Sequence, residues 1–146
     1  MIVPYDDEYF MRQALQEAQA AGEKGEVPVG AVIASGQRII GRAHNLTETL
    51  QDVTAHAEMQ AITAAADFLG GKYLRSCSLY VTLEPCSMCA GALFWSQLDR
   101  LVYAAADVKR GFRNQGGKLH PKTRLEKGPL QEEASALLQD FFAVKR

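Results

Sequence analysis

The sequence predicts an α/β protein in a single domain, residues 1–146, and three observations lead to that prediction. Short apolar runs that fit buried strands alternate along the chain with longer amphipathic stretches that fit helices. Strands separated by helices of this length favour parallel pairing, with the helices packed on the sheet. A chain of 146 residues with 47% hydrophobic and 23% charged residues is also typical of a globular domain with one core.

The N-terminal third is expected to form a helix followed by a β-hairpin. Apolar side chains recur at helical spacing over residues 6–21, and acidic residues occupy the first turn, where they suit the helix dipole. The apolar run 27–33 fits a strand, Ser35 and Gly36 mark a turn, and residues 38–44 return as a second strand.

Helices and strands alternate through the rest of the chain. Gly70 ends a helix, Pro85 ends the clearest buried strand, and Ser87 is expected to cap the helix that follows. In chain order, after a polar loop, the expected elements are a helix over 55–69, a strand over 78–83, a helix over 87–96, a strand over 101–105, a long connection over 107–128 and a helix over 131–144.

One histidine and two cysteines have the spacing of zinc ligands. Glu58 lies two residues after His56, and Cys86 and Cys89 form a Cys-x-x-Cys pair after Pro85. Three protein ligands leave the fourth position of a tetrahedral zinc ion open for water, as in catalytic sites, whereas structural sites close all four positions. The order His-x-Glu followed by Pro-Cys-x-x-Cys is a signature of the zinc nucleobase deaminases. We therefore expect one Zn²⁺ ion per subunit, held by His56, Cys86 and Cys89.

Two other interpretations of the cysteines remain open. Cys86 and Cys89 could form a redox pair, although a His-x-Glu element is not expected beside one. Cys77 could complete a closed structural site, but the strand between Cys77 and Cys86 would hold the two roughly 20 Å apart. A zinc–sulfur bond is only about 2.3 Å long. We expect Cys77 to be a small buried apolar residue instead.

Glu58 is the candidate proton carrier. A carboxylate beside an open zinc position can take a proton from water, pass it to a ring nitrogen and help ammonia to depart, which amounts to hydrolytic deamination. The N–H of Ala57 is a candidate donor to the charge that develops on the substrate. Residues two apart point to nearly opposite sides of a regular helix. The arrangement therefore requires His56 to lie in the first turn of its helix.

The distribution of charge singles out one segment. Residues 109–127 contain seven basic residues and one acidic residue, a charge of +6 on a chain whose net charge is −1, so the remainder carries −7. Such a stretch suggests a contact for phosphates, or a solvated loop with its lysines in water.

The acidic N-terminus lacks a signal-peptide core, and no run approaches the roughly 20 apolar residues of a membrane span. We expect a cytoplasmic protein with no membrane contact.

Two segments carry a resemblance to a known family. Residues 54–59 (TAHAEM) and 82–92 (TLEPCSMCAGA) resemble the bacterial tRNA-specific adenosine deaminases of the cytidine deaminase superfamily. Similar context is found at 26–32 (EVPVGAV) and 136–142 (ALLQDFF), so the resemblance covers nearly the whole chain. It implies a three-layer α/β/α cytidine-deaminase-like fold, with a central mixed five-stranded sheet and helices on both faces.

The resemblance also implies an activity, partners and substrate contacts. The activity is editing of adenosine to inosine at the wobble position of a tRNA anticodon loop, by a homodimer. The corresponding family positions imply that Asn45 contacts the flipped base and that Asp107 lies near the ribose-phosphate backbone, with Lys109 beside it. They also imply that the pocket wall includes Pro28 and Val29, and that the nucleic acid lies near Phe141 and Phe142.

The loop after Asp107 departs from the family pattern, being shorter and more basic. This departure leaves two rival functions open. A deaminase of a free base or nucleoside, of the guanine or cytosine type, would use the same zinc site but would have no use for the basic stretch. A non-catalytic RNA-binding or dimerisation module would keep zinc for folding alone, and would have no use for Glu58.

Overall fold

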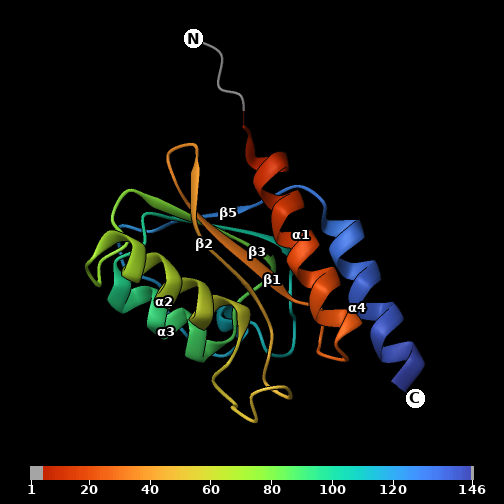
Figure 1. Cartoon of the computed structure of the whole chain (residues 1–146). Helices are drawn as coiled ribbons and strands as arrows, with labels where there is room; N and C mark the ends of the chain where they lie inside the picture. The colour runs from red at the N-terminus through yellow and green to blue at the C-terminus, as the bar shows by residue number, and fades with distance from the viewer. Residues whose placement is uncertain (1–4, 146) are drawn as a thin grey trace.

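A mixed five-stranded sheet forms the middle layer of the computed structural model, which describes residues 5–145 (Figure 1). The strand order is β2-β1-β3-β4-β5. The strands are β1 (Gly30–Ser35), β2 (Arg38–His44), β3 (Cys77–Leu83), β4 (Arg100–Ala105) and β5 (Arg124–Lys127). The helices are α1 (Asp7–Glu23), α2 (Ala57–Leu69), α3 (Ser87–Ser96) and α4 (Gln131–Lys145), with a 3₁₀ turn at Phe112–Asn114.

Helices cover both faces of the sheet, which confirms the three-layer α/β/α fold. Figure 1 shows α1 and α4 on one face and α2 and α3 on the other. Each face buries its own apolar cluster. Phe10 and Met11 of α1 pack with Val32 and Val102 of the sheet. On the opposite face, the apolar cluster contains Ala61, Ala65, Leu93, Ile33 and Leu79.

The strand directions are those of the mixed sheet that the family resemblance implies, and the expected hairpin is formed by β1 and β2. Strands β3 and β4, which flank α3, pair in parallel as predicted, and β1 pairs antiparallel with both β2 and β3. The expected connection over 107–128 contains a strand that the sequence did not predict, since β5 pairs in parallel with β4. The crossover through α2 does join two strands of the same direction, β2 and β3. Their common neighbour β1 lies between them in the sheet and runs the opposite way. The rule that links helical crossovers to parallel strands therefore holds here, but the hairpin partner occupies the intervening position.

The start of one strand and the cap of one helix also differ from prediction. The expected strand over 27–33 begins only at Gly30, because Pro28 has no N–H to donate and the Val29 N–H is used by the Val27 carbonyl at 2.8 Å. Helix α3 has Cys86, not Ser87, at its N-cap position.

Glycines let the helices lie close to the sheet. A Cβ atom placed on Gly30 would lie 2.0 Å from the Ala14 carbonyl oxygen of α1, and one on Gly41 would lie 2.7 Å from the Ala61 carbonyl oxygen of α2. Helix α2 ends at Gly70, whose φ of 70° is left-handed. No helix within residues 5–145 combines the length and the apolar character that crossing a membrane requires.

Candidate metal and substrate site

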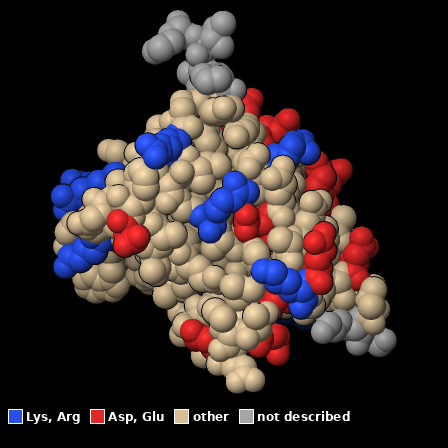
Figure 2. Space-filling view, viewed as in Figure 1, with Lys and Arg blue, Asp and Glu red and all other residues tan. Residues whose placement is uncertain are grey.

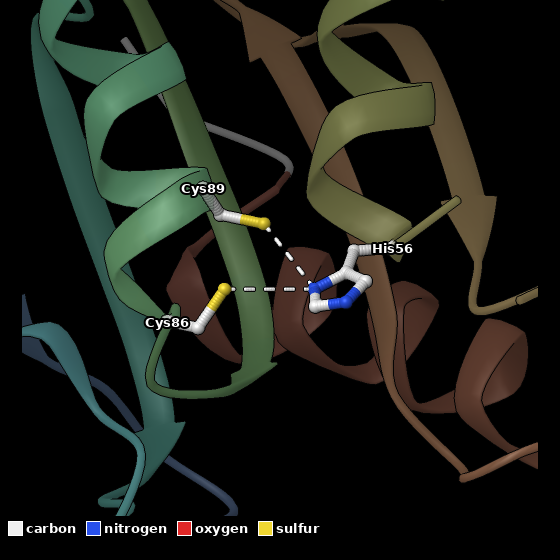
Figure 3. A group of neighbouring side chains, drawn as sticks. All are labelled: His56, Cys86 and Cys89. Carbon is white, nitrogen blue, oxygen red and sulfur yellow. Dashed lines mark hydrogen bonds between the residues drawn. The ribbon is translucent and has the colours of Figure 1, made fainter. Parts of the chain in front are cut away.

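The three predicted zinc ligands come together at the N-terminal ends of α2 and α3 (Figure 3). His56 occupies the N-cap position of α2 with extended backbone angles, φ −70° and ψ 154°. Cys86 occupies the same position on α3, with φ −74° and ψ 175°, and Cys89 lies in the first turn of that helix. Two helix N-termini therefore converge on one point, and their dipoles favour the thiolate form of the cysteines.

The backbone around His56 is held by hydrogen bonds from a single side chain. The Gln60 Nε2 amide donates to the Ala55 carbonyl at 3.0 Å and to the His44 carbonyl at 2.8 Å. It thereby joins the first turn of α2 to the end of β2. The His56 N–H donates to the Thr54 carbonyl at 2.8 Å. These contacts fix the approach of the chain to the ligand before the helix begins.

The ligand distances fit a tetrahedral zinc ion. His56 Nδ1 lies 3.6 Å from Cys86 Sγ and 3.5 Å from Cys89 Sγ. Zinc–nitrogen and zinc–sulfur bonds of ordinary length, at a tetrahedral angle, would separate nitrogen and sulfur by about 3.6 Å. All three ligand atoms lie within 4.8 Å of one another. One histidine and two cysteines that approach so closely are a donor set that zinc prefers.

The position of His56 resolves the spacing problem of the His-x-Glu element. The sequence requires His56 to lie in the first turn, but it lies one residue earlier, at the N-cap, where the backbone is extended. Glu58 is the second helical residue. Because the two residues do not share helical geometry, the opposition of residues two apart in a regular helix does not apply. Both side chains line one cavity.

Glu58 is buried, with 4% of its surface exposed. Burial raises the pKa of this carboxyl to about 7, against smaller lowering contributions from hydrogen bonding to its own backbone N–H and from the charge of His56. A carboxyl with a pKa near neutrality can both accept and release a proton under physiological conditions. In the metal-free protein, burial thus moves the pKa of Glu58 toward the range that a general acid and base requires.

The two cysteines differ in how firmly they hold a proton when no metal is bound. Hydrogen bonding from Cys89 lowers the pKa of Cys86 to about 4 against the effect of burial, and His56 adds to the lowering. The same hydrogen bond raises the pKa of Cys89, and burial raises it further. The two sulfurs thus share one proton in the metal-free protein. Zinc must displace that proton to bind two thiolates.

The cavity beside the ligands has a volume of about 250 Å³. The structure places four of the predicted substrate-contact residues in its lining: Val29, Asn45, Ala57 and Asp107. Asn45 is 8% exposed, and its side-chain oxygen accepts the Thr47 N–H at 3.2 Å. Val27 and Leu83 add apolar surface to the walls. The result is a small, partly apolar recess with a carboxyl and the ligand group along one side.

Four predicted contact residues lie outside this lining. Pro28 is buried and lies next to Gly22 of α1, so its ring does not form part of the cavity wall. Its neighbours Val27 and Val29 take that place. The Lys109 side chain is exposed and lies outside the cavity lining, two residues after Asp107 in the chain.

Phe141 and Phe142 also lie away from the cavity, on α4. Their rings form an edge-to-face pair with centroids 5.3 Å apart. Phe142 is 47% exposed and borders a shallow surface depression with Leu138, Gln139 and Ala143. The apolar residues of this helix therefore divide between two surfaces: Ala134 is buried against the sheet, and Phe142 faces outward.

Sequence reasoning missed two buried carboxylates that hold the loops around the cavity. Glu84, 3% exposed, accepts hydrogen bonds from the Asp107 N–H at 3.1 Å and from the Arg113 guanidinium at 2.9 Å. Glu26 is fully buried and accepts the N–H groups of Glu48 at 3.0 Å and Thr49 at 2.6 Å. One feature of the sequence could have identified them, because each of the two acidic residues lies at the junction of a loop and an apolar run.

The basic segment divides into paired and unpaired charges. Arg113 is paired with Glu84, and Arg124 with Asp99. Lys109 and Arg110 are exposed, and Arg110 lines the cavity mouth. Figure 2 shows acidic side chains gathered over α1 and α4. The exposed side chains of Lys109 and Arg110 carry positive charge on the loop that follows β4.

Comparison with known proteins gives a family for the whole arrangement. Residues 4–105 match the family model of the cytidine and deoxycytidylate deaminase zinc-binding region. The tRNA-specific adenosine deaminase of Aquifex aeolicus is 50% identical over 145 residues, a match that covers 95% of both chains.

Solved structures agree with that match and include a second type of deaminase. A structure from a study of A-to-I editing by tRNA:A34 deaminases at the wobble position of transfer RNA is similar at a TM-score of 0.83 and 42% identity. That match covers 90% of this chain and 99% of the other. A guanine deaminase from Bacillus subtilis is similar at a TM-score of 0.67 and 35% identity, over 77% of this chain and 69% of the other.

Proposed function

The chain belongs to the cytidine and deoxycytidylate deaminase family, and we propose from this premise that it is a zinc-dependent tRNA adenosine deaminase. Its reaction is the hydrolysis of adenosine to inosine at the wobble position of a tRNA anticodon, with release of ammonia. The observation that carries the proposal is Glu58, a buried carboxyl that lines the same base-sized cavity as two of the zinc ligands. That observation also disfavours a non-catalytic module, which would have no use for a buried acid there.

The chain's own residues account for the proton transfers. When bound by His56, Cys86 and Cys89, zinc would supply a water molecule that is nucleophilic at neutral pH. Glu58 accepts the proton of the attacking water and delivers it to the ring nitrogen next to the carbon that is attacked. It then assists protonation of the amino group, which leaves as ammonia. A buried carboxyl that lines the cavity beside the ligands is placed for each of these transfers.

The cavity walls would orient the base. The Ala57 N–H, at the first position of α2, has no partner within the helix and is free to donate to the substrate. The Asn45 amide lies among the lining residues and can hydrogen-bond the nucleoside. Val29 provides an apolar contact for the ring. Asp107 borders the side of the cavity on which the sugar would lie.

The remaining expectations concern partners and place. The exposed Lys109 can contact the phosphates of the RNA, and the exposed Phe142 can stack on its bases. Phe141 packs against Phe142.

Trp95 of α3 is 76% exposed, whereas Leu93 of the same helix is fully buried. An indole so exposed suits an interface between two copies of the chain. We therefore propose a homodimer that uses the Trp95 surface and acts in the cytoplasm, without membrane contact.

The rival function is deamination of a free base. The similarity to a guanine deaminase supports this rival, so the experiment must distinguish the two functions. The zinc-loaded protein would be incubated with an anticodon stem-loop RNA carrying adenosine at the wobble position, and in parallel with free adenosine, cytidine and guanine. We expect inosine in the RNA and no turnover of the free compounds. Turnover of guanine, with no inosine in the RNA, would keep the zinc chemistry and overturn the proposed substrate.

A further inference from the structure

Arg110 differs from every other arginine within residues 5–145. The others each have a carboxylate or an aromatic ring as partner: Arg12 with Glu8, Arg38 over Phe68, Arg42 with Glu17, Arg75 over Tyr73, Arg100 with Asp7, Arg113 with Glu84 and Arg124 with Asp99. In that part of the chain the Arg110 guanidinium has neither an ion pair nor a ring beneath it, and it borders the cavity that contains Glu58.

The backbone that carries Arg110 is fixed from two directions. The Asp107 carboxylate accepts the N–H groups of Lys109 at 3.2 Å and Arg110 at 3.0 Å, which closes a tight turn. On the inner side, the buried Glu84 carboxylate binds the N–H groups of Asp107 and Arg113. The loop that carries the unpartnered Arg110 guanidinium is therefore held in place by hydrogen bonds to two carboxylates.

Gly111 shows how closely this loop is packed. A Cβ atom on Gly111 would lie 2.3 Å from Glu84 Oε2 and 2.4 Å from the Asp107 carbonyl oxygen, so only glycine fits there. The Phe112 N–H donates to the Pro85 carbonyl at 2.9 Å, directly beside the ligand Cys86. The loop is thus attached to the same turn that positions the metal site.

The size of the cavity limits where a phosphate can lie. A volume of about 250 Å³ is below the range of roughly 300–1,000 Å³ that holds drug-sized ligands, so the recess accepts little more than one base. The sugar and phosphates of any polynucleotide must then remain at the mouth, where Arg110 lies. An adenine base carries no negative charge, whereas a phosphodiester does. The planar guanidinium fork matches phosphate oxygens in a two-point contact.

We propose that Arg110 binds a phosphodiester of the RNA strand beside the adenosine whose base enters the cavity. Arg110 thereby selects a polynucleotide over a free nucleoside. This inference rests on the proposed tRNA deaminase function and adds a specificity-determining residue to it.

The test compares Arg110→Ala and Arg110→Lys with the wild type on the anticodon stem-loop RNA. Arg38→Ala is the matched control, because it also removes one arginine charge but does so away from the cavity. Arg38 begins β2, whereas the cavity residue Asn45 follows the other end of that strand. For Arg110→Ala we expect KM to rise about tenfold with kcat nearly unchanged, since the contact is made equally before and during reaction. Arg110→Lys should show a smaller rise in KM, because it keeps the charge but loses the fork.

Salt dependence separates a phosphate contact from a loss of fold. The slope of log kcat/KM against log salt concentration should be shallower by about 0.7 for Arg110→Ala, as expected for one lost contact to a single strand. Arg110→Lys and Arg38→Ala should keep the wild-type slope. Wild-type activity on RNA together with an unchanged KM and slope for Arg110→Ala would overturn the inference and leave the proposed function intact.

Free adenosine and adenosine 5′-monophosphate complete the experiment. Turnover of the monophosphate that depends on Arg110, with none of RNA, would overturn the assignment to a polynucleotide. If the wild-type protein did not deaminate the RNA but did turn over guanine, the proposed function itself would be wrong.

Discussion

At the scale of single residues, the environment of Glu58 explains its role better than its place in a motif does. The residue begins a helix at a cavity wall and is almost entirely buried, so its carboxyl loses the solvation that keeps an exposed glutamate ionised. Removal of its charge should therefore affect chemistry without dismantling the metal site, because Glu58 is not one of the three ligands.

The first prediction is that Glu58→Gln keeps zinc and loses turnover. General acid–base catalysis contributes about 10²–10⁴-fold, so kcat should fall by at least that factor. Inosine formation measures the rate, and elemental analysis of the purified protein measures zinc. Asp67→Asn is the matched control, since it removes an exposed carboxylate from the same helix and should leave both quantities unchanged. Loss of zinc from Glu58→Gln would contradict the assignment.

The second prediction concerns the proton that Cys86 and Cys89 share. Because the pKa of Cys89 is raised, the metal-free site keeps the proton that the two sulfurs share at neutral pH, and the raised pKa of His56 beside Cys86 favours a second proton on the imidazole. Zinc loading should release between about one and two protons per ion near pH 7, as is general where ligands must be deprotonated. A pH-indicator dye in weak buffer measures the release. Zinc uptake with no proton release would show that both thiolates already exist in the metal-free protein.

At the scale of secondary-structure elements, buried carboxylates and glycines determine how loops and helices meet the site. Glu26 holds the loop that follows Asn45, and Glu84 holds the loop that carries Arg110. Neither role is visible in a hydrophobic pattern, because a buried acid breaks that pattern. The same applies to Gly30, whose importance lies in the approach of another helix.

The third prediction is a pH-dependent stability difference for Glu26→Gln. Burial pushes the pKa of Glu26 upward, but hydrogen bonds from Thr49, Glu48 and Thr47 outweigh it and hold the pKa below its ordinary value. A carboxyl with a lowered pKa stabilises the fold above its unfolded pKa, and that contribution is lost as pH falls through its folded value. At pH 7 the variant should therefore unfold more easily, by about 1–3 kcal/mol.

Urea unfolding in the presence of a chelator, at neutral and at acid pH, measures this difference without interference from zinc loss. The gap between wild type and Glu26→Gln should narrow as the pH falls below about 4. Glu23→Gln is the control, since this carboxylate is exposed at the end of α1. A gap of constant size at every pH would mean that the ionised form of Glu26 is not what holds the loop.

The fourth prediction is that Gly30→Ala is strongly destabilising. The added methyl group would lie 2.0 Å from the Ala14 carbonyl oxygen, so α1 must move away from β1. The expected loss is about 1–3 kcal/mol or more, as for other overpacked interiors. Gly71→Ala meets no atom within 4 Å and is the control for the glycine substitution itself. Thermal melts of equal stability for the two variants would contradict the close approach.

At the scale of the whole molecule, the sequence predicted the element types and the ligands because local patterns encode both. The spacing of apolar residues predicted the helices, and His56, Cys86 and Cys89 were recognisable from their order alone. The mixed strand directions could not be predicted from that spacing, because they depend on β1 lying between β2 and β3. The cavity walls could not be predicted for the same reason, and Pro28 and Arg110 show the two kinds of error. Pro28 was assigned to the wall and faces α1, whereas Arg110 was identified only as part of the basic segment and borders the cavity.

The fifth prediction concerns assembly through the Trp95 surface. Substitution of Trp95 by Asp would place a charge at the exposed indole position, where an interface between two copies would have to desolvate it. Sedimentation velocity should show a dimer for the wild type and a monomer for Trp95→Asp, with helical content unchanged. A wild-type monomer, or a variant that remains a dimer, would remove Trp95 from the interface.

The central claim is that this zinc site edits one adenosine in transfer RNA, and sequencing of treated RNA tests it most directly. Unmodified tRNA transcripts would be incubated with the zinc-loaded protein or with Glu58→Gln, reverse-transcribed and sequenced, because inosine is read as guanosine. We expect adenosine-to-guanosine changes at position 34 of the anticodon with the wild type, none elsewhere, and none with Glu58→Gln. An unchanged position 34 in every transcript, with active zinc-loaded protein that deaminates a free base, would contradict the claim.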